Sequence, residues 1–174
     1  MITVEKKEKK ANIFSVYLLG FIIACFLGWV YETVLTSAVE GRFVDRGVLP
    51  VPLLPIYGVF AVAIGFILKK DTHWFKVFVI GTVGTTVFEY ICSVVTEKIF
   101  GYMLWDYFQW KLNFQGRISL FSSIIFGAFC VLYVKGVAPL AELLHEKFPK
   151  AAVIFTFALA LINLGVCIWR WTAV

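Results

Sequence analysis

Two glutamates stand inside long apolar stretches, and they are the residues of this sequence best suited to chemistry. Glu32 lies in "FIIACFLGWVYETVLTSAVEGRF" (21–43), and Glu89 lies in "FVIGTVGTTVFEYICSVVTEKIF" (78–100). A charged side chain deep in a bilayer costs about 2.5 to 3.5 kcal/mol on insertion scales, so it usually faces a partner or a polar cavity. Two carboxylates in such places could bind a cation or a proton.

Polar residues that could complete a binding site follow each glutamate. "DRGVLPVPLLPIYG" (45–58) and "NFQGRISLFSS" (113–123) each place glycine beside arginine. Glycine permits close approach of the backbone, and arginine forms bidentate contacts with anions. With the glutamates, these segments could bind an anion, a cation or a zwitterion. The candidate ligand-binding residues are Glu32, Arg42, Asp45, Arg46, Glu89, Asp106, Asn113 and Arg117.

Membrane helices are the elements that must position these residues. The chain has 174 residues, of which 61% are hydrophobic, 18% aromatic and only 16% charged, and this composition argues against a soluble globular domain. Five windows approach the 20 or so apolar residues that a membrane span needs. We therefore predict an all-α polytopic membrane protein with a single transmembrane domain over 1–174. The predicted spans are 13–35, 52–68, 75–95, 118–137 and 151–169.

The distribution of Lys and Arg predicts how these spans are oriented, because cytoplasmic loops carry the excess of positive charge. An N-terminus inside and a C-terminus outside place ten cations in the cytoplasm and six outside. The inner cations are Lys6, Lys7, Lys9, Lys10, Lys69, Lys70, Lys76, Lys135, Lys147 and Lys150, and the outer ones are Arg42, Arg46, Lys98, Lys111, Arg117 and Arg170. The net charge of +5 is explained by this topology and gives no support to nucleic-acid binding.

The sequence also aligns with itself. Residues 21–43 align on 78–100 without gaps, which pairs Glu32 with Glu89 and Glu40 with Glu97, and "IYGVFAV" (56–62) aligns on "IFGAFCV" (125–131). We predict repeat A over about 13–70, repeat B over about 75–137 and a fifth helix over about 151–169. Repeats of two spans enter the membrane in the same direction, so a pseudo-two-fold axis along the membrane normal would relate them.

Each glutamate continues a row of small residues at four-residue spacing. Gly20, Ala24 and Gly28 precede Glu32, and Gly81 and Thr85 precede Glu89. Small residues at this spacing let helices approach closely in lipid, so both glutamates are predicted to lie on the packed faces of their helices.

Other residues that often carry chemistry are predicted to be structural. The four cysteines fall within the predicted spans without metal-site spacing, and His73 and His145 fall in predicted cytoplasmic loops. A disulfide framework, a metal site or a cofactor is therefore not expected. Trp105, Tyr107 and Trp110 are predicted to be anchors at the membrane interface.

Three motifs resemble those of a known family. They are "GWVYE" (28–32), "RGVLPVPLLPIYG" (46–58) and "WDYFQWKLNFQGRI" (105–118), and they are similar to those of the small bacterial ABC transporter type IV (CmpB-like) permeases. The resemblance covers about residues 13–137 and implies transport. The family usually has glycine and proline where this chain has Val51 and Lys111. The sequence has no G-x-x-x-x-G-K-[ST] loop, so ATP hydrolysis would need a partner subunit.

The leading functional hypothesis is a transporter-like protein of the bacterial inner membrane. It would bind a small solute or a lipid headgroup at an outer-facing polar site between the repeats. Three alternatives stay open: ion pairs that only hold the halves together, an intramembrane acid/base enzyme acting on a lipid-linked substrate, and an accessory subunit of a larger complex. The expected partners are the bilayer, a small-molecule or lipid substrate, and a partner subunit or a second copy of the chain.

Overall fold

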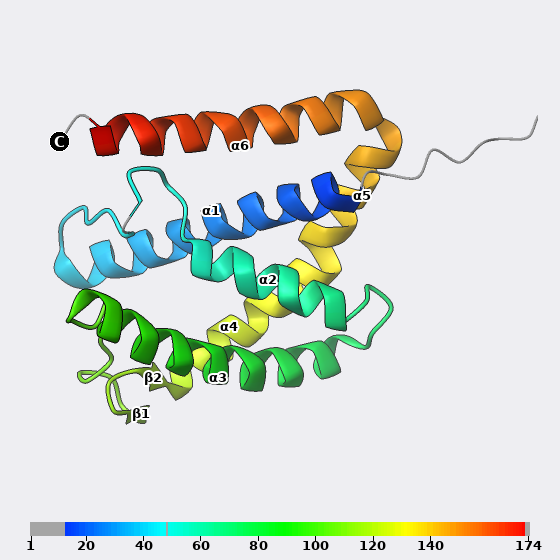
Figure 1. Cartoon of the computed structure of the whole chain (residues 1–174). Coiled ribbons are helices and arrows are strands. Elements are labelled where there is room, and N and C mark those ends of the chain that lie inside the picture. The colour runs from blue at the N-terminus through cyan, green and yellow to red at the C-terminus, as the bar shows by residue number, and fades with distance from the viewer. Residues whose placement is uncertain (1–12, 48, 173–174) are drawn as a thin grey trace, which may run out of the picture. The chain divides into compact units, whose positions relative to one another are not determined.

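The computed structural model describes residues 13–47 and 49–172, which form helices and one short hairpin (Figure 1). The predicted all-α class is confirmed. In chain order the elements are α1 (Ile13–Glu40), α2 (Pro55–Ile67), α3 (Trp74–Phe100), β1 (Asn113–Phe114), β2 (Ile118–Ser119), α4 (Leu120–Leu132), the π-helical turn η1 (Tyr133–Val137), α5 (Ala138–Lys147) and α6 (Pro149–Thr172).

In residues 13–47 and 49–172, four helical segments are long and apolar enough to cross a membrane. They are Ile13–Glu40, Trp74–Phe100, Leu120–Lys147 and Pro149–Arg170. The second predicted span, 52–68, contains only the 13-residue helix α2. At 1.5 Å per residue α2 is about 20 Å long, less than the roughly 30 Å of a hydrocarbon core. The first, third, fourth and fifth predicted spans are therefore confirmed by length and composition. The second predicted span contains a short apolar helix instead.

The segment after the fourth predicted span is helical, although we predicted a cytoplasmic loop there. The helix that begins at Leu120 runs through η1 and α5 to Lys147. Pro139 lies in the first turn of α5, directly after the π-helical turn. A π-helical turn changes the backbone spacing locally, so the proline ring does not have to end the helix.

The chain forms two compact units, which are described separately. Of the described residues, unit 1 comprises 13–47, 49–62 and 137–172, and unit 2 comprises 63–136. In unit 1, α1 packs against α5 and α6. In unit 2, α3 packs against α4. The inner lysines Lys6, Lys7, Lys9 and Lys10, on which much of the predicted topology rests, lie outside the described residues.

Glycines bring the helices of each unit close together. In unit 1, a Cβ built on Gly58 of α2 would lie 2.4 Å from Cys25 Sγ and 2.6 Å from the Phe21 ring. In unit 2, a Cβ built on Gly127 of α4 would lie 2.0 Å from Thr82 Oγ1 and 3.1 Å from the Phe78 ring. Such close approach suits helix packing in lipid, where small residues replace the hydrophobic effect as the determinant of contact.

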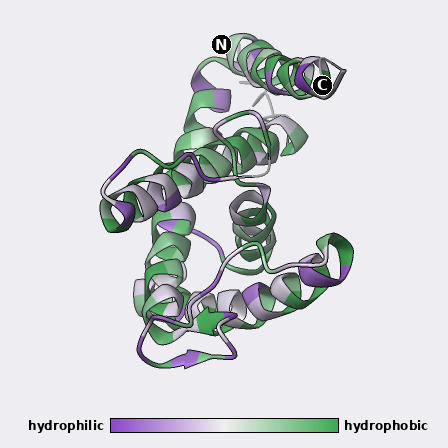
Figure 2. Ribbon diagram, turned by 90° about the vertical axis from the view of Figure 1, so that its left-hand side faces the viewer, coloured by the Kyte–Doolittle hydropathy of each residue, from purple (hydrophilic) through white to green (hydrophobic). Residues whose placement is uncertain are grey.

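Apolar side chains cover much of the helical surface. In Figure 2 the helices are mainly green and pale, and purple gathers in the connecting segments and at helix ends. On α6, the side chains of Ile154, Leu161 and Trp169 are at least 66% exposed. A surface of this kind is stable in lipid and not in water, which agrees with a membrane protein.

Candidate functional site

In unit 1, the non-helical segment after α1 turns back along that helix. The N–H of Val44 donates to Ser37 Oγ (2.9 Å), the N–H of Arg46 donates to Thr33 Oγ1 (3.3 Å), and the N–H of Leu54 donates to the Cys25 carbonyl (3.1 Å). The contacts on α1 run from residue 37 back to residue 25, a rise of about 18 Å. Irregular backbone therefore lies beside the middle of a membrane-spanning helix.

Side chains from this segment, α1 and α2 meet in a group that we call the Glu32 cluster: Trp29, Glu32, Asp45, Arg46 and Tyr57. Tyr57 OH donates to Glu32 Oε1 (2.7 Å), and Arg46 Nε lies 3.7 Å from Glu32 Oε2. Trp29 Nε1 donates to Asp45 Oδ1 (2.7 Å). Trp29 and Glu32 are three residues apart and so share a face of α1. That face therefore contacts both Asp45 and Arg46.

The Glu32 cluster is partly open to its surroundings. The side chain of Glu32 is 19% exposed and that of Arg46 is 31% exposed. The Arg46–Glu32 contact is longer than a hydrogen bond. Among the described residues, neither Nη1 nor Nη2 of Arg46 has a hydrogen-bond partner. The guanidinium therefore keeps donors that a ligand could use.

In unit 2, a tight hairpin carries the second arginine. Gln115 (φ 55°) and Gly116 (φ 65°) both have positive φ, and the N–H of Arg117 donates to the Phe114 carbonyl (3.1 Å). Two central residues of this conformation are typical of a type I′ turn. Asn113 braces the turn, since its Oδ1 accepts from the Gly116 N–H (3.0 Å) and its Nδ2 donates to the Trp110 carbonyl (2.8 Å).

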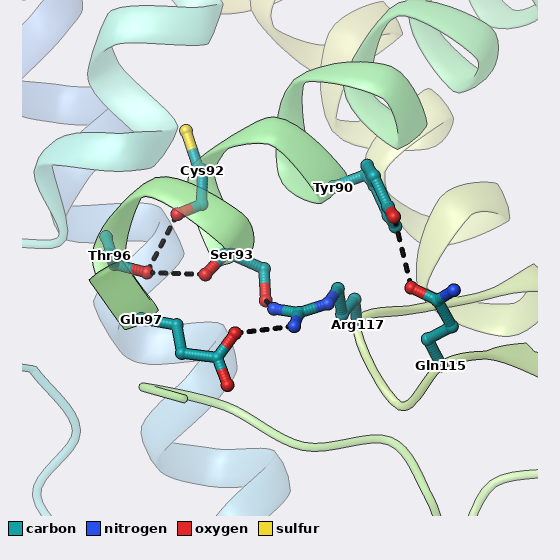
Figure 3. Close-up of polar contacts among 7 residues, drawn as sticks. All are labelled: Tyr90, Cys92, Ser93, Thr96, Glu97, Gln115 and Arg117. Carbon is teal, nitrogen blue, oxygen red and sulfur yellow. Dashed lines mark hydrogen bonds and ion pairs between the residues drawn. The ribbon is translucent and has the colours of Figure 1, made fainter. Parts of the chain in front are cut away.

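Arg117 fastens this hairpin to α3. Its Nη1 donates to Ser93 Oγ (3.1 Å) and its Nη2 forms an ion pair with Glu97, as Figure 3 shows. Its carbonyl accepts from Trp105 Nε1 (3.0 Å), and its side chain is only 16% exposed. Both Nη atoms of Arg117 are engaged within the protein, in contrast to those of Arg46.

Glu89 lies on the buried face of α3, with 4% of its surface exposed. Tyr107 OH donates to Glu89 Oε1 (2.8 Å), and the N–H of Tyr107 donates to the Gly116 carbonyl (2.8 Å). The hairpin therefore positions the tyrosine that holds the glutamate. The prediction that the small-residue rows lie on packed faces is confirmed, because Gly20, Ala24 and Gly28 of α1 and Gly81, Thr85 and Ser93 of α3 are all buried.

Two of the predicted ligand-binding residues lie in more exposed positions. Arg42 forms an ion pair with Glu40 (3.7 Å), with the side chains 74% and 50% exposed. Asp106 is exposed, and its Oδ1 accepts from the N–H of Phe108 (2.6 Å). Asp106 and Asn113 therefore both stabilise the backbone of the segment that leads to Arg117.

Sequence reasoning missed the residues that hold the carboxylates. Trp29 and Tyr57 had no predicted role, and Tyr107 was predicted to be a membrane anchor. Tyr57 and Tyr107 reach the glutamates through backbone folds that no periodic pattern encodes. A signal for Tyr57 was its place two residues after Pro55, the last proline of the P-x-P-x-x-P segment, in the first turn of α2.

His145 was also wrongly predicted to lie in a cytoplasmic loop. It belongs to α5 and is 1% exposed. Its Nδ1 lies 2.8 Å from the Ala141 carbonyl, and its Nε2 bonds to Ser15 of α1. A carbonyl only accepts, so Nδ1 of His145 donates to the Ala141 carbonyl. The contact with Ser15 joins α5 to α1 within unit 1.

No group of three or more His, Cys, Asp or Glu side chains in residues 13–47 and 49–172 is placed to hold a metal ion. The polar groups of both units instead combine carboxylates with arginine, tyrosine and tryptophan. Such groups can bind a polar ligand by hydrogen bonds and charge.

Comparison with known proteins assigns this architecture to a transporter family. No curated protein and no solved structure matches the chain. Residues 19–168 match the family described as "Putative ABC-transporter type IV". The match covers most of the chain, including α3, the hairpin and α4 in full. The chain is therefore a membrane protein that belongs to the "Putative ABC-transporter type IV" family.

Proposed function

We propose that this transporter-like protein binds a small solute or a lipid headgroup through the polar groups around Glu32 and Glu89. The observation that carries the proposal is a carboxylate on an apolar helix in each unit, held by a tyrosine hydroxyl at 2.7 Å for Glu32 and 2.8 Å for Glu89. Ionisable residues within membrane helices are costly and commonly mark ligand or ion pathways. Family membership points the same way.

Matching contacts inside the two units support a duplicated origin. The internal alignment pairs Phe21 with Phe78, Cys25 with Thr82 and Gly58 with Gly127. Gly58 approaches Phe21 and Cys25 in unit 1, and Gly127 approaches Phe78 and Thr82 in unit 2. Equivalent residues thus make equivalent contacts, as two copies of one ancestral unit would. That Glu32 and Glu89 face one another stays a prediction.

The tyrosines that contact Glu32 and Glu89 provide a second argument that these carboxylates have a functional role. Tyr57 aligns with Phe126, which has no hydroxyl. In unit 2 the hydroxyl comes instead from Tyr107, which lies in the loop before the hairpin. A phenol therefore contacts the carboxylate in both units although it comes from different parts of the chain. This favours a role for the carboxylates that goes beyond helix packing.

Retention of small molecules by purified variants tests the proposal. Native mass spectrometry of the wild-type protein released from detergent should detect a bound lipid or solute. Glu32→Gln and Glu89→Gln should lower its occupancy, because the neutral amide keeps the shape of the side chain and removes the charge. Glu40→Gln is the matched control, since Glu40 is exposed and its ion pair is with the exposed Arg42.

Two outcomes would contradict the proposal. One is that the wild-type protein retains nothing from either lipid extract or cytosolic extract. The other is equal occupancy in all variants, provided that their thermal unfolding midpoints match the wild type. Either result would leave the glutamates as groups that only stabilise the fold.

A further inference from the structure

The two arginines that the sequence placed in similar motifs have different surroundings. The guanidinium of Arg117 donates hydrogen bonds to Ser93 and Glu97 within unit 2. Among the described residues the guanidinium of Arg46 contacts only Glu32, with its Nε 3.7 Å from Oε2, and the side chain is twice as exposed as that of Arg117, at 31% against 16%. Of the two, Arg46 is the arginine that can engage a ligand directly, with the planar fork that suits phosphate.

Charge within the Glu32 cluster decides which kind of ligand fits. Glu32 and Asp45 contribute two negative charges and Arg46 one positive charge, so the cluster has a formal charge of −1. A simple anion would approach two carboxylates, and a simple cation would approach a guanidinium. A zwitterion can place its anionic group on Arg46 and its cationic group on a carboxylate, so each charge meets its opposite.

Asp45 and Arg46 contact neighbouring positions on one face of α1. Trp29 holds Asp45 and Glu32 contacts Arg46. Trp29 and Glu32 are separated by about 4.5 Å along α1, because each of the three residues adds a rise of about 1.5 Å. Only Oδ1 of Asp45 bonds to Trp29, and Oδ2 has no hydrogen-bond partner among the described residues. Asp45 Oδ2 and the Nη atoms of Arg46, which belong to consecutive residues, thus have no hydrogen-bond partner among the described residues.

Exposed apolar residues next to the cluster indicate what else the ligand carries. Phe43, two residues before Asp45, is 74% exposed, and Val39 at the end of α1 is 73% exposed. The two flank a polar segment at the end of a membrane-spanning helix. Acyl chains would cover such side chains in the bilayer. The cluster therefore combines charges for a headgroup with an apolar surface for its chains.

We propose that the Glu32 cluster recognises phosphoethanolamine chemistry, with Arg46 binding the phosphate and the Asp45 and Glu32 carboxylates binding the primary ammonium. The proposal rests on the proposed function and names the ligand class for the site in unit 1. The source of the group is either a phosphatidylethanolamine headgroup or soluble phosphoethanolamine. A primary ammonium donates hydrogen bonds to carboxylates, whereas a quaternary ammonium cannot.

Competition between lipids tests the proposal on the full chain. The delipidated protein is incorporated into nanodiscs that contain equal amounts of phosphatidylethanolamine, phosphatidylcholine and phosphatidylglycerol, and the retained lipids are counted by native mass spectrometry. We expect phosphatidylethanolamine to be enriched about tenfold or more over the other two, since loss of one charge-assisted contact costs about that factor. Soluble phosphoethanolamine, added as a separate arm, should compete with it.

Variants separate recognition from folding. Arg46→Gln and Asp45→Asn should each reduce the enrichment about tenfold, and Asp45→Asn can keep the bond from Trp29 because the amide oxygen still accepts. Arg170→Gln is the matched control, since it makes the same charge change at an exposed position of α6 in unit 1. It should leave the enrichment unchanged.

Each result has a defined meaning. Enrichment of phosphatidylethanolamine lost in Arg46→Gln and Asp45→Asn supports a lipid ligand, and binding of phosphoethanolamine alone with the same losses supports a soluble one. A Glu32-dependent ligand without either preference overturns this inference and leaves the proposed function standing. Retention of no ligand by the wild-type protein overturns both. Enrichment that survives in Arg46→Gln overturns the role of Arg46.

Discussion

At the scale of single residues, the two arginines show that similar sequence motifs can have different roles. Arg117 makes contacts to Ser93 and Glu97 and is mostly buried, whereas the Nη atoms of Arg46 have no hydrogen-bond partner in the part of the chain that the structure describes. Hydrogen bonds to charged groups stabilise a fold by about 1.5 to 3 kcal/mol. We expect Arg117→Gln to lower the free energy of unfolding by about that amount.

Unfolding of the Arg117→Gln protein in mixed micelles, followed by far-UV circular dichroism, measures this effect. Arg42→Gln provides the comparison, because an exposed ion pair such as Arg42–Glu40 contributes about 0 to 1 kcal/mol. Equal stability of the two variants would show that Arg117 does not fasten the hairpin to α3. The Arg117–Glu97 ion pair lies within unit 2, so it stabilises that unit, and the alternative that ion pairs hold the two halves together stays a hypothesis.

At the scale of elements, helix packing within each unit depends on glycines that let the helices touch. We expect Gly127→Ala to lower the free energy of unfolding by about 1 to 3 kcal/mol, because overpacking forces neighbours to move. The new methyl group would lie 2.0 Å from Thr82 Oγ1. Gly165→Ala is the control, since nothing lies within 4 Å of a Cβ built there.

A double variant identifies the cause of that loss. If the clash with Thr82 is responsible, Thr82→Ala should restore part of the stability in the Gly127→Ala background, and the two changes should not be additive. Additive losses in chemical unfolding would indicate that the helices can shift apart and that the close approach of α4 to α3 is not needed.

The sequence predicts those elements whose apolar or small residues recur at a regular helical spacing. The apolar windows and the four-residue rows before Glu32 and Glu89 repeat along a helix, so α1, α3 and their buried faces could be predicted. Three features could not: the late start of α2 at Pro55, the hairpin turn at Gln115 and Gly116, and the continuation through Pro139. Each depends on local backbone geometry that apolar periodicity does not encode.

The candidate site was predictable only in part for the same reason. Glu32, Arg46, Glu89 and Arg117 stand out because charge is rare in an apolar chain. Their partners Tyr57 and Tyr107 are ordinary aromatic residues in a sequence that is 18% aromatic. Only the path of the chain brings these hydroxyls to the carboxylates, so composition could not distinguish them from membrane anchors.

At the scale of the whole molecule, the number of membrane crossings depends on whether the segment that contains the short helix α2 crosses the membrane. The 13 residues of α2 are about 20 Å long, and the irregular segment before it returns along α1 as far as Cys25. Irregular backbone is tolerated at membrane depth where protein or a polar cavity surrounds it. The segment and α2 together can therefore make one crossing, and we expect five crossings with the N-terminus inside.

Labelling of single cysteines in intact cells tests this topology. In a variant whose four native cysteines are replaced, a membrane-impermeant thiol reagent should label Glu40→Cys and Asp106→Cys directly. It should label Asp71→Cys and Glu146→Cys only after permeabilisation, because these positions follow the second and fourth crossings. Direct labelling of Asp71→Cys together with Glu40→Cys would mean that α2 turns back within the membrane. In that case residues 41–71 would form a re-entrant loop and the chain would cross the membrane four times. The predicted distribution of Lys and Arg between the two sides would then be wrong.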